Sequence, residues 1–257
     1  MTFQRIVITG ASSGLGAELA RQLAGTDVTV VLVGRNIDRL EQVAEASRAK
    51  GATAHAVALD ISDPIMGQKL AELDRRYQFD LVIAAAGIAA GKETPEIARQ
   101  ITATNVIGVQ NTVDAILPGL IERGRGQIGL ISSLAGFRAL GGPPAYSASK
   151  SWVRLYGEAL RGRLARKGIG VSVICPGFVD TPMVDDTTRA KLGQQLVAVD
   201  QAAALTIKAL QQNRARLSFP RAMALRVWWL AAQPAWLSDR RIKRHQRATQ
   251  THQDRSD

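Results

Sequence analysis

Tyr146 and Lys150 form a pair that is suited to acid–base chemistry. They are four residues apart, so a helix would place the phenol and the ammonium on one face. A nearby positive charge favours the phenolate, and we expect it to lower the pKa of Tyr146 toward neutrality. Such a phenol can exchange a proton with an oxygen atom of a small molecule. The same spacing also arises by chance on surface helices, so the pair needs support from the rest of the chain.

A glycine-rich turn near the N-terminus supplies the first support. Residues 5–9 are rich in β-branched side chains and predict a strand, and residues 17–24 predict a helix. Gly10, Gly14 and Gly16 lie between them, where a backbone without side chains can turn sharply and approach a ligand. The free N–H groups at the start of the helix favour an anion, so the segment predicts a pyrophosphate-binding turn.

Five separated motifs resemble the short-chain dehydrogenase/reductase family in their order and spacing. They are Thr9-Gly-x-x-x-Gly-x-Gly16, Asn105, Ser133, Tyr146-x-x-x-Lys150 and Pro176-Gly177. The match extends from about Phe3 to Phe219, which is most of the chain. The resemblance implies a single-domain Rossmann-like fold and an NAD(P)(H)-dependent oxidoreductase that interconverts carbonyl compounds and alcohols.

The resemblance also implies roles for the catalytic residues. Tyr146 would be the general acid in reduction, and Ser133 would hydrogen-bond the substrate oxygen, with the neighbouring Ser132 as the alternative. Lys150 would lower the pKa of Tyr146 and hold the nicotinamide ribose. Asn105 would anchor a proton-relay water, support a kink in its helix, or do both.

Arg35 predicts a preference for NADP(H). It follows the second expected strand, at the position where an acid would accept from a ribose 2′-hydroxyl and an arginine would bind a 2′-phosphate. The nearby Asp38 suits the cap of the next helix instead. The alternative is that Arg35 is one of many basic surface residues in a chain of net charge +11. The other expected cofactor contacts are Thr9, Gly10, Ser12, Ser13, Gly14, Leu15, Gly16, Asp60, Ile61, Ala86, Gly87, Tyr146, Lys150, Pro176, Gly177 and Thr181.

Two segments leave their interpretation open. Asp60 and Ile61 are expected at the adenine ring, but Asp60-Ile-Ser-Asp63 is equally a turn and helix cap. Ala84 and Ala85 stand where the family commonly has two asparagines, which puts local sheet support and cofactor affinity in doubt.

Length and composition favour one α/β domain. The 257 residues are 46% apolar, and short Val/Ile-rich runs alternate with helical segments, which predicts a doubly wound parallel sheet of about seven strands with helices on both faces. The position of Cys175 at the end of an apolar strand suggests that its thiol is buried. The three histidines form no metal-ligand motif, so no metal is expected. The predicted strands are residues 5–9, 28–33, 53–58, 81–84, 127–132, 170–175 and 216–219.

Two loops are expected near a substrate. The segment from Phe178 to about Leu196 should form a covering loop and helix that sets specificity. Asp180, Asp185 and Asp186 make this segment polar, so it does not identify the substrate. Gly141-Gly-Pro-Pro144, just before Tyr146, suggests either a pocket wall or a turn that starts a helix.

The composition changes after residue 220. We expect residues 1–220 to form the catalytic domain and residues 221–257 to form an extension with eight Lys or Arg against three Asp or Glu. An apolar stripe with helical spacing precedes a basic cluster at residues 240–244, and Pro234 should end the helix near Ala232. The stripe consists of Leu225, Trp228, Trp229, Ala232 and Trp236. It packs on the domain or a second subunit, or it docks on an anionic membrane. Nucleic acid is the least favoured partner, because no recognition motif accompanies the charge.

The leading prediction is an NADPH-dependent reductase of a ketone or aldehyde, with an apolar or lipid-like substrate suggested by the C-terminal extension. The alternative is a silent NADP-binding regulatory or scaffold protein, for which Ala84 and Ala85 are the only sequence support. The chain shows no secretory pattern at Met1 and no apolar run of about 20 residues, so we expect a cytoplasmic protein with peripheral membrane contact. The resemblance further implies a homodimer or homotetramer, paired through helices near residues 94–121 and 146–167.

Overall fold

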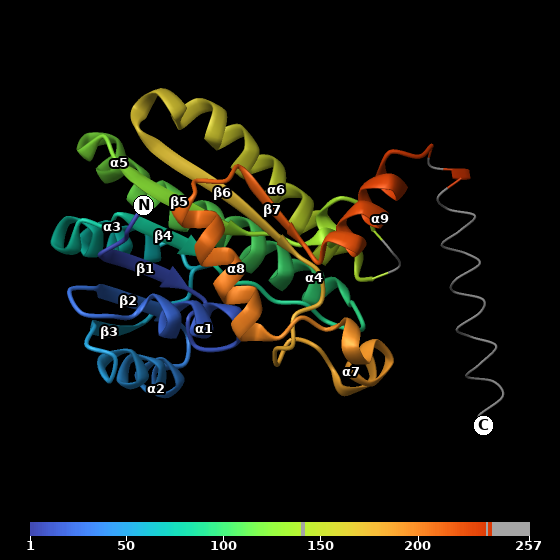
Figure 1. The fold of residues 1–257 in the computed structure, drawn as a ribbon, viewed down its shortest axis with the longest axis horizontal. Coiled ribbons are helices and arrows are strands. Elements are labelled where there is room, and N and C mark those ends of the chain that lie inside the picture. The colour runs from blue at the N-terminus through green and yellow to red at the C-terminus, as the bar shows by residue number, and fades with distance from the viewer. Residues whose placement is uncertain (140–141, 235, 238–257) are drawn as a thin grey trace.

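The computed structural model describes residues 1–139, 142–234, 236 and 237 and contains one seven-stranded sheet (Figure 1). Neighbouring strands are parallel throughout, in the order β3-β2-β1-β4-β5-β6-β7. The predicted sheet is confirmed, with boundaries shifted by no more than a single residue. The strands are β1 (Arg5–Thr9), β2 (Thr29–Gly34), β3 (Thr53–Ala58), β4 (Leu81–Ala84), β5 (Gly126–Ile131), β6 (Ile169–Pro176) and β7 (Arg216–Phe219).

Helices cover both faces of the sheet (Figure 1). One face carries α1 (Gly14–Leu23), α2 (Ile37–Arg48) and α8 (Val199–Gln211). The other carries α3 (Met66–Tyr77), α5 (Gly108–Arg123) and α6 (Pro144–Leu164). The helix α4 (Pro95–Thr102) continues through a π-helical turn, Ala103–Ile107, into α5. The helices α7 (Asp186–Leu192) and α9 (Arg221–Ala231) lie beyond the carboxyl-terminal edge of the sheet (Figure 1).

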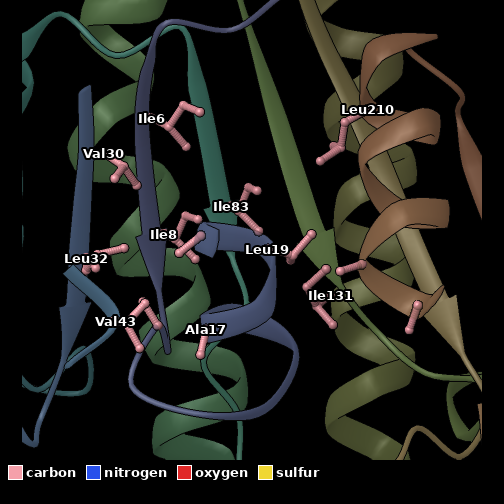
Figure 2. Close-up of a cluster of buried hydrophobic side chains, with 14 of the residues drawn as sticks. Ile6, Ile8, Ala17, Leu19, Val30, Leu32, Val43, Ile83, Ile131 and Leu210 are labelled. Carbon is pink, nitrogen blue, oxygen red and sulfur yellow. The ribbon is translucent and has the colours of Figure 1, made fainter. Parts of the chain in front are cut away.

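The core forms two layers because side chains of each strand alternate between the faces. Ile6 and Ile8 of β1 pack with Leu19 of α1 and Leu210 of α8 (Figure 2), whereas Val7 packs on the opposite side. A strand that is covered on both faces is a nearly continuous run of apolar residues. The same feature made the strands recognisable in the sequence. None of the helices in the described ranges combines the length and apolar content that crossing a bilayer requires.

The direction of the strand order reverses between β1 and β4. In such sheets ligands bind in the crevice beyond the carboxyl ends of the two strands. Here the turn after β1 meets the segment after β4 so closely that a Cβ atom on Gly10 would lie 2.5 Å from the Cα atom of Ala86. The fold therefore places the glycine turn and residues 85–87 at one edge.

Candidate active site

Three polar side chains from two elements come together at this edge. Tyr146 lies in the first turns of α6 and Lys150 one turn later, and the Lys150 Nζ atom is 5.8 Å from the centre of the Tyr146 ring. Ser133 follows β5, and its hydroxyl lies close enough to the Tyr146 phenol to affect the pKa of that group. The structure thus brings the predicted serine, tyrosine and lysine into one cluster.

The two adjacent serines have different partners. Ser132 is buried and its hydroxyl donates to the backbone oxygen of Lys150 at 2.7 Å, so it fixes α6 against β5. The Ser133 Oγ atom accepts from the Ala135 N–H at 3.1 Å and lies 3.4 Å from the Pro176 oxygen, to which it donates. Because only Ser133 of the two affects the pKa of the Tyr146 phenol, the structure favours it over Ser132.

The expected lowering of the Tyr146 pKa is wrong for this structure. Burial raises the pKa of Tyr146, and the nearby Ser133 hydroxyl opposes the rise only in part. Burial also lowers the pKa of Lys150 to about 8, and its ammonium donates to the Ile131 oxygen at 3.0 Å. Loss of water disfavours the charged form of both groups, and this outweighs the attraction that the spacing alone suggested.

Asn105 lies in the π-helical turn and is fully buried. Its carbonyl oxygen accepts from the Ile88 N–H at 2.8 Å, and its amide donates to the Ile88 oxygen and the Ser149 hydroxyl, both at 3.0 Å. Such turns often occur at functional sites. Asn105 therefore joins the segment after β4 to α6, and both of its predicted roles, the water anchor and the support of a helix kink, stay predictions.

Two positioning residues were not identified from the sequence. The Ser149 hydroxyl accepts from Asn105 and donates to the backbone oxygen of Tyr146 at 2.8 Å. The Glu93 carboxylate accepts from the Ala145 N–H at 3.0 Å, at the start of α6. Ser149 lies inside the Tyr-x-x-x-Lys motif, so its position in the sequence could have indicated a role beside Tyr146. Glu93 is 52 residues from its partner, and no local pattern announces such a contact.

The glycine turn fits a phosphate group. The first N–H groups of α1 have no acceptor within the helix, and an anion is favoured there. Gly14 has a φ of +54°, and its Cα faces Thr181, which a Cβ atom would approach at 3.4 Å. The Thr9 Oγ1 atom is buried without a hydrogen-bond partner in the described part of the chain. Ser12 lies against Gly34 at the end of β2. Ser13 is exposed and directly precedes α1, whose first two residues are Gly14 and Leu15.

The opposite end of the crevice carries Arg35 and Asp60. Both are exposed, and Arg35 lies close enough to contribute to lowering the pKa of Asp60, after the larger effect of hydrogen bonds from Ser62. The Asp60 carboxylate accepts from the Ser62 N–H at 2.9 Å, as a turn would require. The assignment of Asp38 as the next helix cap is wrong. Asn36 caps α2 by accepting from the Arg39 N–H at 2.9 Å, because it directly precedes the first helical residue.

Several predicted cofactor contacts have well-defined surroundings. A Cβ atom on Gly87 would lie 3.1 Å from the Lys150 Nζ atom, so glycine leaves room in the cluster. The Ile61 side chain is buried against Gly108, so only the backbone of Ile61 is left to contact a cofactor. Gly177 donates to the Phe219 oxygen at 2.7 Å, directly after Pro176 ends β6. The departure at Ala84 is absorbed by apolar packing inside the sheet.

The segment after β6 forms the expected loop and helix. Asp180 forms an ion pair with Arg189, and Asp185 caps α7 by accepting from the Thr188 N–H at 2.8 Å. The acidic residues of this segment therefore shape it. Of the segment before Tyr146, Pro143 and Pro144 begin α6 while Gly141 lies outside the described residues. Within the described ranges, no cluster of His, Cys, Asp and Glu is arranged for a metal ion.

Comparison with known proteins agrees with this geometry. The model of the short chain dehydrogenase family matches residues 4–192. An uncharacterized oxidoreductase of Myxococcus xanthus is 37% identical over 232 residues, which cover 88% of this chain and 90% of the relative. The ketoacyl reductase HetN of Nostoc is 35% identical over 198 residues, 73% of this chain and 68% of the relative.

A solved short-chain dehydrogenase from Sphingobium yanoikuyae, in complex with NADPH, has the same fold. It superimposes with a TM-score of 0.78 at 25% identity, over 87% of this chain and 90% of the other. Other solved chains of this fold are bound to NAD. The chain belongs to the short-chain dehydrogenase/reductase family. It is an oxidoreductase that acts between alcohol and carbonyl groups and uses a nicotinamide cofactor.

Proposed function

We propose that this protein uses NADPH to reduce a ketone or an aldehyde to an alcohol. The observation that carries the proposal is the cluster of Ser133, Tyr146 and Lys150, at the edge that also holds the glycine turn. The bound nicotinamide supplies the hydride. Ser133 hydrogen-bonds the carbonyl oxygen, and Tyr146 gives it a proton as negative charge develops there. Because burial raises the pKa of Tyr146, the phenol carries its proton at neutral pH, as the acid in reduction must.

Lys150 and Asn105 support Tyr146 in this proposal. The Lys150 ammonium lies below the cofactor crevice and has donors for ribose hydroxyls, while its charge stabilises the phenolate that remains after proton transfer. Asn105 fixes Ile88 and Ser149, and Ser149 in turn contacts the backbone of Tyr146. These neutral hydrogen bonds help to fix the position of Tyr146.

We propose that the other predicted cofactor contacts serve NADP(H). The turn from Gly10 to Gly16 with Thr181 would bind the pyrophosphate, and Arg35 would bind the 2′-phosphate. The exposed position of Arg35 after β2, with Asp60 already hydrogen-bonded to Ser62, supports this preference.

The Tyr146→Phe variant tests the proposed function. Removing the proton donor should lower kcat by about 10²–10⁴-fold while NADPH binding, measured by fluorescence, is retained. The matched control is Tyr156→Phe on the same helix, where the hydroxyl is hydrogen-bonded to Asp114 away from the cluster. Substrates for the assay come from a screen of carbonyl compounds by loss of NADPH absorbance. Unchanged turnover in Tyr146→Phe would refute the acid assignment, and NADPH binding without turnover of any compound would favour a silent cofactor-binding protein.

We also propose how the chain is organised in the cell. Residues 1–220 form the catalytic unit and residues 221–257 an extension, as the change in composition at residue 220 indicates. The family resemblance supports a homodimer or homotetramer. A single buried thiol, Cys175, whose pKa burial raises to about 11, is consistent with a cytoplasmic location.

A further inference from the structure

The helix α9 has one face that packs on the catalytic domain. Ala224 and Val227 are buried with Leu134 and Cys175. Trp228 joins them through its ring, whose centroid is 5.9 Å from that of Phe137. The Arg216 guanidinium lies 5.4 Å from the Trp228 ring. The inner face of α9 is therefore anchored, and the predicted apolar stripe divides at Trp228.

The outer face of α9 presents large apolar side chains to solvent. Leu225 is 62% exposed and Trp229, one turn later, is 54% exposed. Trp236, beyond the end of the helix, is 61% exposed. Arg221 and Arg226 are exposed beside them. Tryptophan and leucine next to arginine are the combination that lies at a membrane–water interface.

The sequence from residue 201 to residue 238 carries only positive charge, and Arg216 within it is paired with Glu158 of α6 at 2.9 Å. No Asp or Glu occurs between Asp200 and Asp239 in the sequence, whereas Lys208 and four arginines do. Two of these arginines, Arg214 and Arg216, line a cavity of about 620 Å³ beside Trp228, together with Arg161 and the single acid Glu158. The basic cluster at residues 240–244, predicted from the sequence, lies outside the described residues. The surface is thus complementary to anionic head groups.

A second copy of the chain fits this surface poorly. A two-fold interface brings the same patch of both subunits together. Arg221 and Arg226 would then face the same two arginines, and the nearest sequence between residues 201 and 238 offers no carboxylate to pair with them. Like charges in contact are destabilising, so an anionic lipid surface is the better partner.

The position of α9 gives this surface a connection to the active site. α9 leaves the sheet at the ends of β6 and β7 (Figure 1), and Met223 contacts Gly177, the residue after β6. Phe178 and Met183 of the adjoining loop are exposed as well. We propose that the outer face of α9, with Trp236, docks on an anionic membrane and delivers apolar carbonyl compounds from the lipid to the site. The second half of this proposal rests on the proposed function.

Vesicle co-sedimentation of the full chain tests the docking. We expect binding to vesicles of phosphatidylcholine mixed with phosphatidylglycerol, weaker binding to phosphatidylcholine alone, and a decrease at high salt. Leu225→Ser combined with Trp229→Ser should weaken binding by at least about tenfold, because apolar area drives insertion. Ile65→Ser is the control, since Ile65 is also 62% exposed but lies before α3. Equal binding by all variants, or none to anionic vesicles, would overturn the proposal. A change in the native mass of the double variant without a change in its vesicle binding would also overturn it. Preferential binding of the wild type to duplex DNA over vesicles would do the same.

Two assays separate docking from catalysis. Turnover of ethyl acetoacetate in solution, without vesicles, should be the same in the wild type and the double variant. Turnover of a long-chain alkyl methyl ketone dissolved in anionic vesicles should fall at least about tenfold in the double variant alone. Equal turnover of the vesicle-bound ketone would refute delivery even if docking is found. Failure of both ketones with normal vesicle binding would count against the proposed function and leave docking in place.

Discussion

The pH dependence of reduction depends on the two buried groups Tyr146 and Lys150. Burial lowers the pKa of Lys150 to about 8, so its ammonium is present at neutral pH and is lost as pH rises through that value. The pKa of Tyr146 is raised, so the phenol stays protonated over the same range. We expect kcat/KM for reduction to be level near neutral pH and to fall above about 8, by up to about tenfold per pH unit.

The reverse reaction provides the check on this assignment. Oxidation of the alcohol needs Tyr146 as a base, and a phenol of raised pKa becomes a base only at higher pH. Profiles of kcat/KM in both directions should therefore slope in opposite senses in alkaline solution. A rate of reduction that increases through this range would contradict the roles given to both residues.

Arg35 can be tested through the difference between the two cofactors. Arg35→Asp removes a charged hydrogen bond to the 2′-phosphate, worth about 1.5–3 kcal/mol, so NADPH should bind about 10- to 150-fold more weakly. NADH lacks this phosphate and should change far less. Dissociation constants from fluorescence titration measure both. Arg166→Asp makes the same charge change at the far end of α6, after which β6 begins, and should leave the ratio unaltered. Equal losses for NADPH and NADH in Arg35→Asp would refute the preference.

At the scale of elements, the π-helical turn makes a specific claim about stability. Asn105→Ala leaves the partly buried N–H and C=O groups of Ile88 without their partner. Each unsatisfied group costs about 1–3 kcal/mol, so we expect the free energy of unfolding to fall by about 2–4 kcal/mol in a urea titration. Turnover should fall too, because Ser149 loses the contact that helps to fix Tyr146.

Asn111→Ala is the matched control for the π-helical turn. Its side chain makes one hydrogen bond, to the Ile61 oxygen at 3.1 Å, and it lies on the continuation of the same helical run. Its loss should cost about 1 kcal/mol and leave kcat unchanged. Similar losses of stability and turnover in both variants would mean that Asn105 has no special position.

The elements were predictable where the signal is local. Strands such as β1 are apolar at consecutive positions because both faces are covered, and the glycine turn follows at once. The cap of α2 was misassigned because Asn36 and Asp38 are both good acceptors and only the first helical residue decides between them. The pKa of Tyr146 and the contact of Glu93 with α6 depend on burial and on residues distant in the sequence. The stripe of α9 was predicted as one surface, but Phe137 and Arg216 take Trp228 to the inner face.

The whole molecule has a further exposed apolar site on α6, far from α9 in the sequence. Leu155 is 56% exposed. On the same helix, the rings of Trp152 and Tyr156 stack with centroids 4.5 Å apart. Apolar and aromatic side chains on a long helix are typical of subunit interfaces. This observation supports the proposed pairing of the long helices, which the sequence supplied only through resemblance.

Leu155→Glu tests the assembly. We expect the wild-type chain to have a native mass of two or four chains by light scattering after size exclusion, about the sizes that closed symmetry favours. A carboxylate at position 155 would have to lose its water inside the interface without a partner, so the variant should dissociate toward the single chain. Ile65→Glu makes an equivalent change at an exposed site before α3 and should keep the wild-type mass. Two results would contradict pairing through α6: a wild type with the mass of one chain, or a Leu155→Glu variant that keeps the wild-type mass. The exposed apolar side chains of α6 would then not form a subunit interface.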